Sequence, residues 1–482
     1  MFRLLNREET DLHQTVIRSY FWVGSWTAAN CILMLVRSIV LARLLMPEIF
    51  GLISIATIVL SGIEVFTQTG FGPALIHRQG NFADAKDTTF TLIVIRGFLL
   101  AILTFFIAPL IAVYYQEPIL KTIIRTITVC FILRGFKNIN IVALDKEMNF
   151  KKRASFELIS YPATVVAAIV LVYFMRNVWA LVIAEITSAL IPTILSYIMV
   201  PWKLSFHFNG KIARELLTYG KFITGGAAVA FIIAQGDNAL VAKVLGLKIL
   251  GYYVLAYNLA TMIINHVNSL VTNVMFPLFS QLQEDLVAVQ NEYLKTLKLV
   301  AIISFPLAAG IAMLAPEIIR IVYGEQWLPA VGALQVLCIF SAFLAIGGTA
   351  YPILAGMGYP NIHFYINSAR LLLMALLIYP LTKSYGIIGT SYAVLIPLGL
   401  TQIFFFAFII RKLQFKIGNL LTRIALPIGG SLVMVAFLVL CKSYIVIASI
   451  PILFMVVMVS ALLYGLCHFL IEGRRLAYQI SK

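Results

Sequence analysis

Long apolar runs, separated by short polar breaks, follow one another along almost the whole of this 482-residue chain. A helix that crosses a bilayer needs about 20 mostly apolar residues. Charged residues make up only 12% of the chain, whereas soluble domains carry roughly 25%. The runs predict an all-α polytopic membrane protein with about fourteen transmembrane helices, at residues 16–42, 47–70, 88–114, 118–142, 157–175, 178–200, 219–244, 250–280, 295–315, 330–355, 361–382, 385–410, 422–441 and 446–471.

Lysine and arginine residues are distributed unevenly between the two sides of this predicted topology. If the N-terminus is cytoplasmic, the inner loops hold most of them, including Arg78, Lys86, Lys146, Lys151, Lys152, Arg153, Lys203, Lys211, Arg214, Arg411, Lys412, Lys416, Arg474, Arg475 and Lys482. The outer loops hold mostly single basic residues, such as Arg43, Arg176, Arg320, Lys383 and Lys442. Because cytoplasmic loops collect Lys and Arg, we expect both termini in the cytoplasm. The same rule explains much of the net charge of +16 without a nucleic acid partner.

Motifs for catalysis, nucleotide binding or metal binding are absent from the sequence. It contains no Walker A motif, no HExxH and no nucleophile-elbow serine, and its six histidines are scattered. The five cysteines lack the spacing of a metal site or of a disulfide framework. We therefore expect a protein that is not an enzyme, with no catalytic residues, no metal and no cofactor.

Two short segments recur at a nearly constant distance along the chain. ARLLMPEIFGL at 42–52 aligns with AKVLGLKILGY at 242–252, and VWALVIAEITSALIP at 178–192 aligns with IIGTSYAVLIPLGLT at 387–401. Both matches fall at the same place in a unit of six spans, although chance similarity between apolar helices is an alternative. Repeats of six spans share one orientation in the membrane. We predict two six-helix pseudo-symmetric lobes, at 1–200 and 201–412, followed by two C-terminal helices and a cytoplasmic tail at 413–482.

Two stripes of polar side chains recur at helical spacing in equivalent spans of the two repeats, which places each stripe on one helix face. They consist of Thr57, Ser61, Glu64 and Gln68 in the second span and of Tyr257, Thr261, Asn265, Asn268 and Thr272 in the eighth. In lipid, a polar face must meet another helix or a water-filled cavity. Hydrogen bonds between helices explain single Ser or Thr residues, whereas whole stripes favour a cavity lining. We therefore predict substrate binding by Glu64, Gln68, Asn265 and Asn268.

A few ionic side chains lie deep within predicted spans. Arg96 is about nine residues into the third span, roughly 13 Å along the helix, and Arg370 is about as far into the eleventh. A guanidinium at that depth reaches the membrane surface incompletely and should face water or an anion such as phosphate or carboxylate. We predict that Arg96 and Arg370 bind an anionic substrate, with structural ion pairs as an equal alternative. Nearer the helix ends, the side chains expected to extend to the membrane surface are Arg125, Arg134, Lys137 and Lys221.

The stretch IIAQGDNALVAKVLG, residues 232–246, places Asp237 inside the seventh span. A carboxylate there costs several kcal/mol unless it has a partner or water. The repeat offset of 200 sets Arg37 opposite Asp237. We predict that these two side chains form an ion pair that closes the outer side of an inward-facing state, with a static tether as the alternative. Arg37, Asp237 and Glu185 are accordingly assigned to gating or ion coupling.

Five further motifs follow one another along the chain. They are LARLLMPEIFGLISIATIV, TGFGPALIHR, GDNALVAKVLGLKILGYYVLAYNLA, MFPLFSQLQED and VYGEQWLPAVGALQVL. In this order they resemble the polysaccharide transporters of the multidrug/oligosaccharidyl-lipid/polysaccharide (MOP) superfamily, in particular Wzx-type flippases of the WzxC colanic acid exporter kind. The resemblance covers nearly all of residues 15–410 and matches neither Arg96 nor Arg370 to a family motif.

The resemblance implies a bacterial inner-membrane protein with a MOP/MATE-like fold of two six-helix lobes and two further helices. It implies alternating-access translocation of undecaprenyl-pyrophosphate-linked oligosaccharide repeat units for O-antigen, capsule or exopolysaccharide export. An ion gradient or the membrane potential would drive this transport. The implied partners are the lipid-linked oligosaccharide, membrane lipids and the polysaccharide polymerase machinery.

Two other functions remain open from the sequence. A MATE-like multidrug or small-molecule antiporter would favour acidic groups in an aromatic pocket, and the deep arginines weigh against it. A membrane-embedded glycan polymerase or ligase would need a sizeable outer loop, and the outer loops here are short. The flippase is therefore the favoured hypothesis.

Overall fold

Helices make up most of the chain in the computed structural model, which describes residues 29–67, 82–146, 150–202 and 204–480. These residues contain no β-strand. The chain divides into two compact units, Met1–Ile232 and Ile233–Lys482. The all-α prediction is confirmed for the described residues, whereas the boundaries predicted at residues 200 and 412 stay a prediction.

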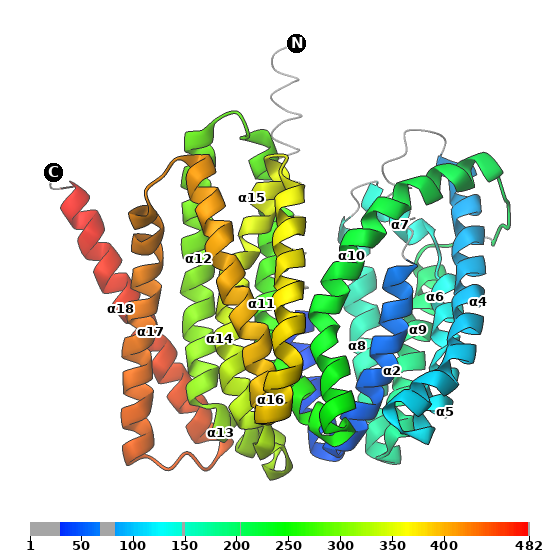
Figure 1. Cartoon of the computed structure of the whole chain (residues 1–482), viewed down its shortest axis with the longest axis horizontal. Coiled ribbons are helices and arrows are strands. Elements are labelled where there is room, and N and C mark those ends of the chain that lie inside the picture. Colours follow the sequence, from blue (N-terminus) through cyan, green and yellow to red (C-terminus); the bar gives the residue numbers. More distant parts are fainter. Residues whose placement is uncertain (1–28, 68–81, 147–149, 203, 481–482) are drawn as a thin grey trace. The chain divides into compact units, whose positions relative to one another are not determined.

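The first unit is a bundle in which neighbouring helices pack closely. Its described helices are residues 29–44, α2 (Pro47–Phe66), α4 (Phe82–Tyr115), α5 (Pro118–Ile127), α6 (Val129–Gly135), α7 (Asn140–Lys146), α8 (Phe150–Met175), α9 (Val178–Met199) and the first part of α10 (Gly210–Leu245) (Figure 1). α8 packs against α9, and α4 packs against α5 and α6. Gly97 permits the close approach of α4 to α6, because a Cβ atom there would lie 2.7 Å from the carbonyl oxygen of Phe131.

The second unit contains the end of α10 and all later helices. These are α11 (Leu247–Gln281), α12 (Leu286–Met313), α13 (Ala315–Ile318), η1 (Ile319–Tyr323), η2 (Glu325–Ala330), α14 (Val331–Gly348), α15 (Ala350–Gly356), α16 (Pro360–Leu413), α17 (Ile417–Tyr444) and α18 (Ile450–Ile480). A large core cluster includes the buried rings of Phe279, Tyr293 and Phe405. α17 packs against α12, and α17 and α18 lie side by side at one edge of this unit (Figure 1).

Eleven helices in the described part of the chain are long and apolar enough to cross a membrane, so the predicted count of fourteen is not confirmed. The predicted span 16–42 lies partly outside the described residues. The span 118–142 divides at Thr128, whose hydroxyl donates to the Arg125 carbonyl oxygen at 2.6 Å and so competes with the helical ladder. The spans 361–382 and 385–410 form the two limbs of α16, which bends at Gly386, where φ is 60°.

Large apolar side chains are exposed along the helices of both units. The exposed fraction is 69% for Leu110 of α4, 79% for Phe174 of α8 and 64% for Phe454 of α18. Extended apolar surfaces of this kind are rare on soluble monomers, whereas hydrocarbon tails cover them in a bilayer. The exposed faces therefore agree with the membrane-spanning topology predicted from the apolar runs.

Candidate functional site

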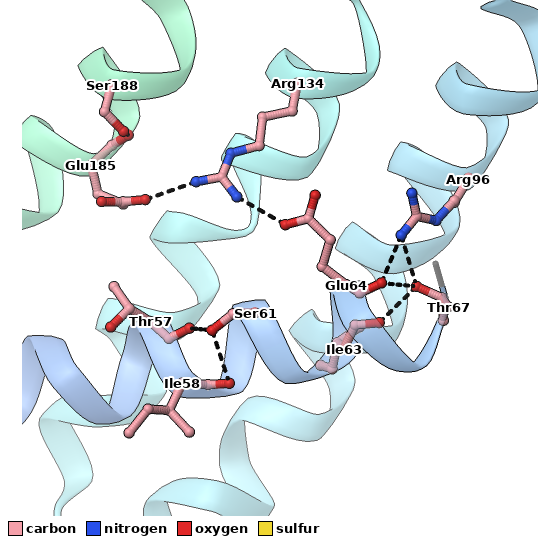
Figure 2. A network of polar contacts seen from close by, with 10 residues as sticks. All are labelled: Thr57, Ile58, Ser61, Ile63, Glu64, Thr67, Arg96, Arg134, Glu185 and Ser188. Carbon is pink, nitrogen blue, oxygen red and sulfur yellow. Dashed lines mark hydrogen bonds and ion pairs between the residues drawn. The ribbon is translucent and has the colours of Figure 1, made fainter. Parts of the chain in front are cut away.

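A cluster of ionic side chains lies among α2, α4, α6 and α9 of the first unit (Figure 2). The Arg134 guanidinium bridges two carboxylates, with Nη1 3.0 Å from Glu64 Oε2 and Nη2 2.9 Å from Glu185 Oε1. Arg96 approaches the same place from α4, and its Nη2 donates to the Glu64 carbonyl oxygen at 2.8 Å and to Thr67 Oγ1 at 3.2 Å. Two guanidinium groups and two carboxylates thus meet in one cluster, which we call the Arg134 cluster.

The end of α2 explains why Arg96 binds there. The last four carbonyl groups of a helix have no partner within the helix. Thr67 follows α2 directly and its hydroxyl donates to the Ile63 carbonyl oxygen at 2.6 Å, while Arg96 occupies the Glu64 carbonyl oxygen. Arg96 Nε has no hydrogen-bond partner among the described residues. Arg96 therefore stabilises the end of α2 and still has a donor to offer.

The side chains of the Arg134 cluster are partly accessible and mutually neutralising. Arg134 and Glu64 expose 38% of their side chains and Glu185 exposes 21%. Charged groups within membrane spans are stable when they pair or meet water. Because a guanidinium also binds phosphate in the same bidentate fashion, an anionic group could replace either carboxylate on Arg134.

The interpretation of Arg134 as a side chain that extends to the membrane surface was wrong. It assumed a continuous helix over 118–142, in which Arg134 would lie near one end. Instead, Arg134 in the last turn of α6 pairs with Glu64 of α2 and Glu185 of α9. The only signal in the sequence was the presence of two deep acids, Glu64 and Glu185, that required a cation.

The polar stripe of the second span has a mixed outcome. Thr57 donates to the carbonyl oxygens of Ile53 and Ser54, both at 2.9 Å, and Ser61 donates to the Thr57 carbonyl oxygen. These hydroxyls satisfy their own helix, as single Ser and Thr residues commonly do. Glu64 contacts another helix through its carboxylate, and Gln68 lies outside the described residues.

The stripe of the eighth span also divides into two kinds of side chain. Asn265 is exposed on α11. Asn268 packs against α14, where its Nδ2 donates to the Leu344 carbonyl oxygen at 3.2 Å and its amide fills the space beside Gly348. Asn268 therefore has a structural contact, whereas Asn265 is available to a ligand.

Asp237 is fully buried in the second unit and has partners there. Its Oδ2 accepts a hydrogen bond from the Tyr253 hydroxyl at 2.8 Å, and its Oδ1 accepts one from the Asn238 backbone amide, also at 2.8 Å. Arg370 of α16 lies within electrostatic range of Asp237, and its guanidinium is 5.7 Å from the centre of the Phe340 ring. Arg370 Nε has no hydrogen-bond partner among the described residues. The deep charges of this unit thus offset each other.

Arg37 is half-buried on the helix 29–44 and lies within electrostatic range of Tyr161 of α8. Its predicted ion pair with Asp237 connects the two units and stays a prediction. In the part of the chain that the structure describes, no three His, Cys, Asp or Glu side chains are grouped to hold a metal ion.

Comparison with known proteins shows the family of this chain. The model of the family described as "Polysaccharide biosynthesis protein" matches residues 40–332, more than half of the sequence. The chain belongs to this polysaccharide biosynthesis protein family. The similarity to polysaccharide transporters that the sequence motifs indicated is therefore confirmed.

Two relatives of this polysaccharide biosynthesis protein carry names that describe their roles. The lipopolysaccharide biosynthesis protein WzxC of Escherichia coli strain K12 is 23% identical over 358 residues, covering 74% of this chain and 73% of WzxC. The succinoglycan biosynthesis transport protein ExoT of Rhizobium meliloti strain 1021 is 24% identical over 352 residues, covering 73% of this chain and 71% of ExoT.

A solved structure of the lipid II flippase MurJ, in an inward closed conformation, has the same fold as this polysaccharide biosynthesis protein. It superposes with a TM-score of 0.73 at 15% identity, covering 94% of this chain and 99% of the MurJ chain. The fold is that of the MOP superfamily, as predicted. The relative ExoT is named a transport protein, and the structures that share this fold are named a flippase and a transporter.

Proposed function

We propose that this transporter is a flippase that moves undecaprenyl-pyrophosphate-linked oligosaccharide repeat units across the bacterial inner membrane for surface polysaccharide export. The observation that carries the proposal is the Arg134 cluster, in which two guanidinium groups meet inside a helical bundle. Its family relatives WzxC and ExoT, named for lipopolysaccharide biosynthesis and succinoglycan transport, support a glycan cargo.

The chemistry of the cluster suits a pyrophosphate headgroup. A charged, hydroxyl-rich headgroup does not cross hydrocarbon unaided, because its desolvation is too unfavourable. A wet cavity with guanidinium groups replaces much of the lost hydration. We propose that the pyrophosphate takes the spare Arg96 donor and displaces Glu64 or Glu185 from Arg134, while the polyprenyl chain stays in lipid.

Further side chains are proposed to bind the cargo through their polar groups. Arg370 has an unsatisfied Nε donor and is proposed as a second site for the anionic headgroup. The exposed Asn265, together with Gln68, is proposed to meet the sugars, whereas the predicted role of Asn268 is replaced by its contact with α14. Transport proceeds by alternating access, with both termini in the cytoplasm and with delivery to the polysaccharide polymerase machinery on the outer side.

Replacing Arg96 by glutamine tests this proposal. One hydrogen bond to a charged group contributes about 1.5–3 kcal/mol, so transport should fall at least about tenfold. The measurement is the amount of lipid-linked repeat unit that accumulates in the cytoplasmic leaflet of cells whose own copy of the protein is deleted. Arg125→Gln is the matched control, because Arg125 is half-buried, stacks at 4.1 Å on the Phe105 ring of α4 and lies outside the Arg134 cluster. Normal surface polysaccharide with both Arg96→Gln and Arg370→Gln would refute the assignment.

The proposed proximity of positions 37 and 237 can be tested without altering the Asp237 carboxylate or its hydrogen-bond partners Tyr253 and Asn238. Ala234 is exposed and lies one helical turn before Asp237 on α10. In a chain lacking its native cysteines, Arg37→Cys and Ala234→Cys should crosslink through a short bismaleimide in the inward-facing state. Arg37→Cys with Gly225→Cys, more than two turns further along α10, is the control and should not react. Equal crosslinking of both pairs would contradict the gate.

A further inference from the structure

The connection between α9 and α10 is unusually basic and apolar at the same time. Residues 201–214 read PWKLSFHFNGKIAR, which contains Lys203, Lys211 and Arg214 but no acidic residue. The structure describes all of these residues except Lys203. Residues 204–209 have no helical or strand structure, and α10 begins at Gly210. We call residues 201–214 the basic connection.

Contacts with α4 and α9 hold the basic connection in one position. The Thr91 hydroxyl donates to the His207 carbonyl oxygen at 3.1 Å, and the Asn209 amide donates to Thr88 Oγ1 at 3.3 Å. The Trp202 ring meets Phe90 edge-on at 4.8 Å and stacks on Tyr197 at 6.4 Å. The connection is therefore anchored at both ends.

Large apolar side chains nevertheless point outward from this anchored segment. The exposed fraction is 53% for Leu204, 61% for Phe206 and 59% for Phe208. All three lie in the non-helical part of the connection, residues 204–209. Lys211 is exposed in the next turn of chain, and Lys86 Nζ lies 5.5 Å from the centre of the Trp202 ring. Aromatic and basic groups thus share one surface.

The position of this surface explains why exposed apolar side chains and basic side chains occur together on it. The membrane span of α9 ends at Met199, directly before the basic connection, and Thr88 and Thr91 near the start of α4 contact it, so the connection lies where α9 and α4 meet the bilayer surface. Asp87 is the nearest acidic residue on α4 with a described side chain, and it is only half-buried. Aromatic rings prefer the headgroup layer, and basic side chains there attract anionic lipids.

We propose that the basic connection is a binding surface for anionic phospholipid headgroups. Leu204, Phe206 and Phe208 enter the headgroup layer, and Lys211 and Lys86 bind the phosphate groups of the leaflet. Charge complementarity selects this occupant, because residues 201–214 contain three basic residues and Glu215 is the only acidic residue that adjoins them. The proposal concerns bulk phospholipid and does not depend on the cargo of the transporter.

The test uses the full chain in nanodiscs that contain equal amounts of phosphatidylglycerol and phosphatidylcholine. Native mass spectrometry after release counts the two lipids retained on the protein. We expect phosphatidylglycerol to be enriched, and Lys211→Gln should lower the enrichment about fivefold, the factor that one basic group near an anionic surface contributes. Lys121→Gln is the matched control, since Lys121 is an exposed lysine of α5 that lies outside the basic connection.

A second measurement identifies the occupant directly. With p-benzoylphenylalanine in place of Phe208, irradiation in cells should attach phospholipid to the chain, and this adduct should fall in the Lys211→Gln background. Equal retention of the two lipids by the unmodified chain would overturn the proposal. So would crosslinks from position 208 that capture a protein and no phospholipid.

Discussion

Replacing Arg134 by glutamine should abolish transport and lower the free energy of unfolding by about 2 kcal/mol, between the values typical of exposed and buried ion pairs. The reason is that Glu64 and Glu185 both depend on this one guanidinium, at 3.0 and 2.9 Å. Without it, two carboxylates remain in a low-dielectric bundle with no bridging cation. The measurements are chemical unfolding of the purified protein in detergent and accumulation of lipid-linked repeat units in the cytoplasmic leaflet.

Second-site substitutions separate the structural part of this effect from the functional part. Glu64→Gln with Glu185→Gln removes both unpaired charges, so adding them to Arg134→Gln should restore most of the lost stability. Transport should stay absent in the triple variant, because the guanidinium that we assign to the headgroup is still missing. Arg134→Lys should retain transport only in part, since an ammonium lacks the planar fork that bridges two carboxylates. Recovery of transport in the triple variant would show that Arg134 is purely structural.

The sequence predicted the members of the Arg134 cluster unequally. Arg96, Glu64 and Glu185 were found because a charged residue deep inside an apolar run must have a partner or water. Arg134 was missed because it lies in the last turn of its helix, where a long basic side chain is expected to reach the membrane surface. The acids that bind it come from α2 and α9, and an apolar run gives no signal of which helices lie beside it.

The partners of Asp237 show a second limit of the sequence. Tyr253 follows Asp237 across the short turn at Gly246, where φ is 89°, so the α10–α11 hairpin brings them together and could have been predicted. Arg370 comes from α16, more than a hundred residues away, and its approach depends on packing within the second unit. The offset of 200 relates a position in one predicted repeat to the equivalent position in the other, and it therefore paired Asp237 with Arg37. It contains no information on contacts within one repeat, such as that between Asp237 of α10 and Arg370 of α16.

One pair of electrostatic neighbours in the first unit and one pair in the second unit lie at positions that the two repeat offsets relate to each other. Arg37 is within electrostatic range of Tyr161, and Asp237 is within range of Arg370. The offset of 200 carries Arg37 onto Asp237, and the offset of 209, seen between 178–192 and 387–401, carries Tyr161 onto Arg370. Two repeats with equivalent contacts between their first and fifth spans would produce this pattern. The two-repeat organisation stays a prediction.

Removing the Asp237 carboxylate should have the largest effect on stability in the second unit. Asp237 is fully buried, whereas the members of the Arg134 cluster are partly accessible. Deleting the carboxylate leaves two buried donors, the Tyr253 hydroxyl and the Asn238 amide, without their acceptor, at about 1–3 kcal/mol each. Asp237→Ala should therefore lower the free energy of unfolding by about 2–6 kcal/mol. The loss is measured by chemical unfolding in detergent, with the amount of folded protein in the membrane as a second readout.

The contribution of each Asp237 partner can be separated by further variants. Tyr253→Phe removes one hydrogen bond of 2.8 Å and leaves the ionic partners in place, so it should cost only about 1–3 kcal/mol. Arg370→Leu combined with Asp237→Ala removes both charges, and this double variant should be markedly more stable than Asp237→Ala alone. If the double variant were as unstable as the sum of its single variants, Asp237 and Arg370 would not be coupled. Asp237 would then be retained for its hydrogen bonds to Tyr253 and Asn238, and the buried arginine would need a different counter-charge.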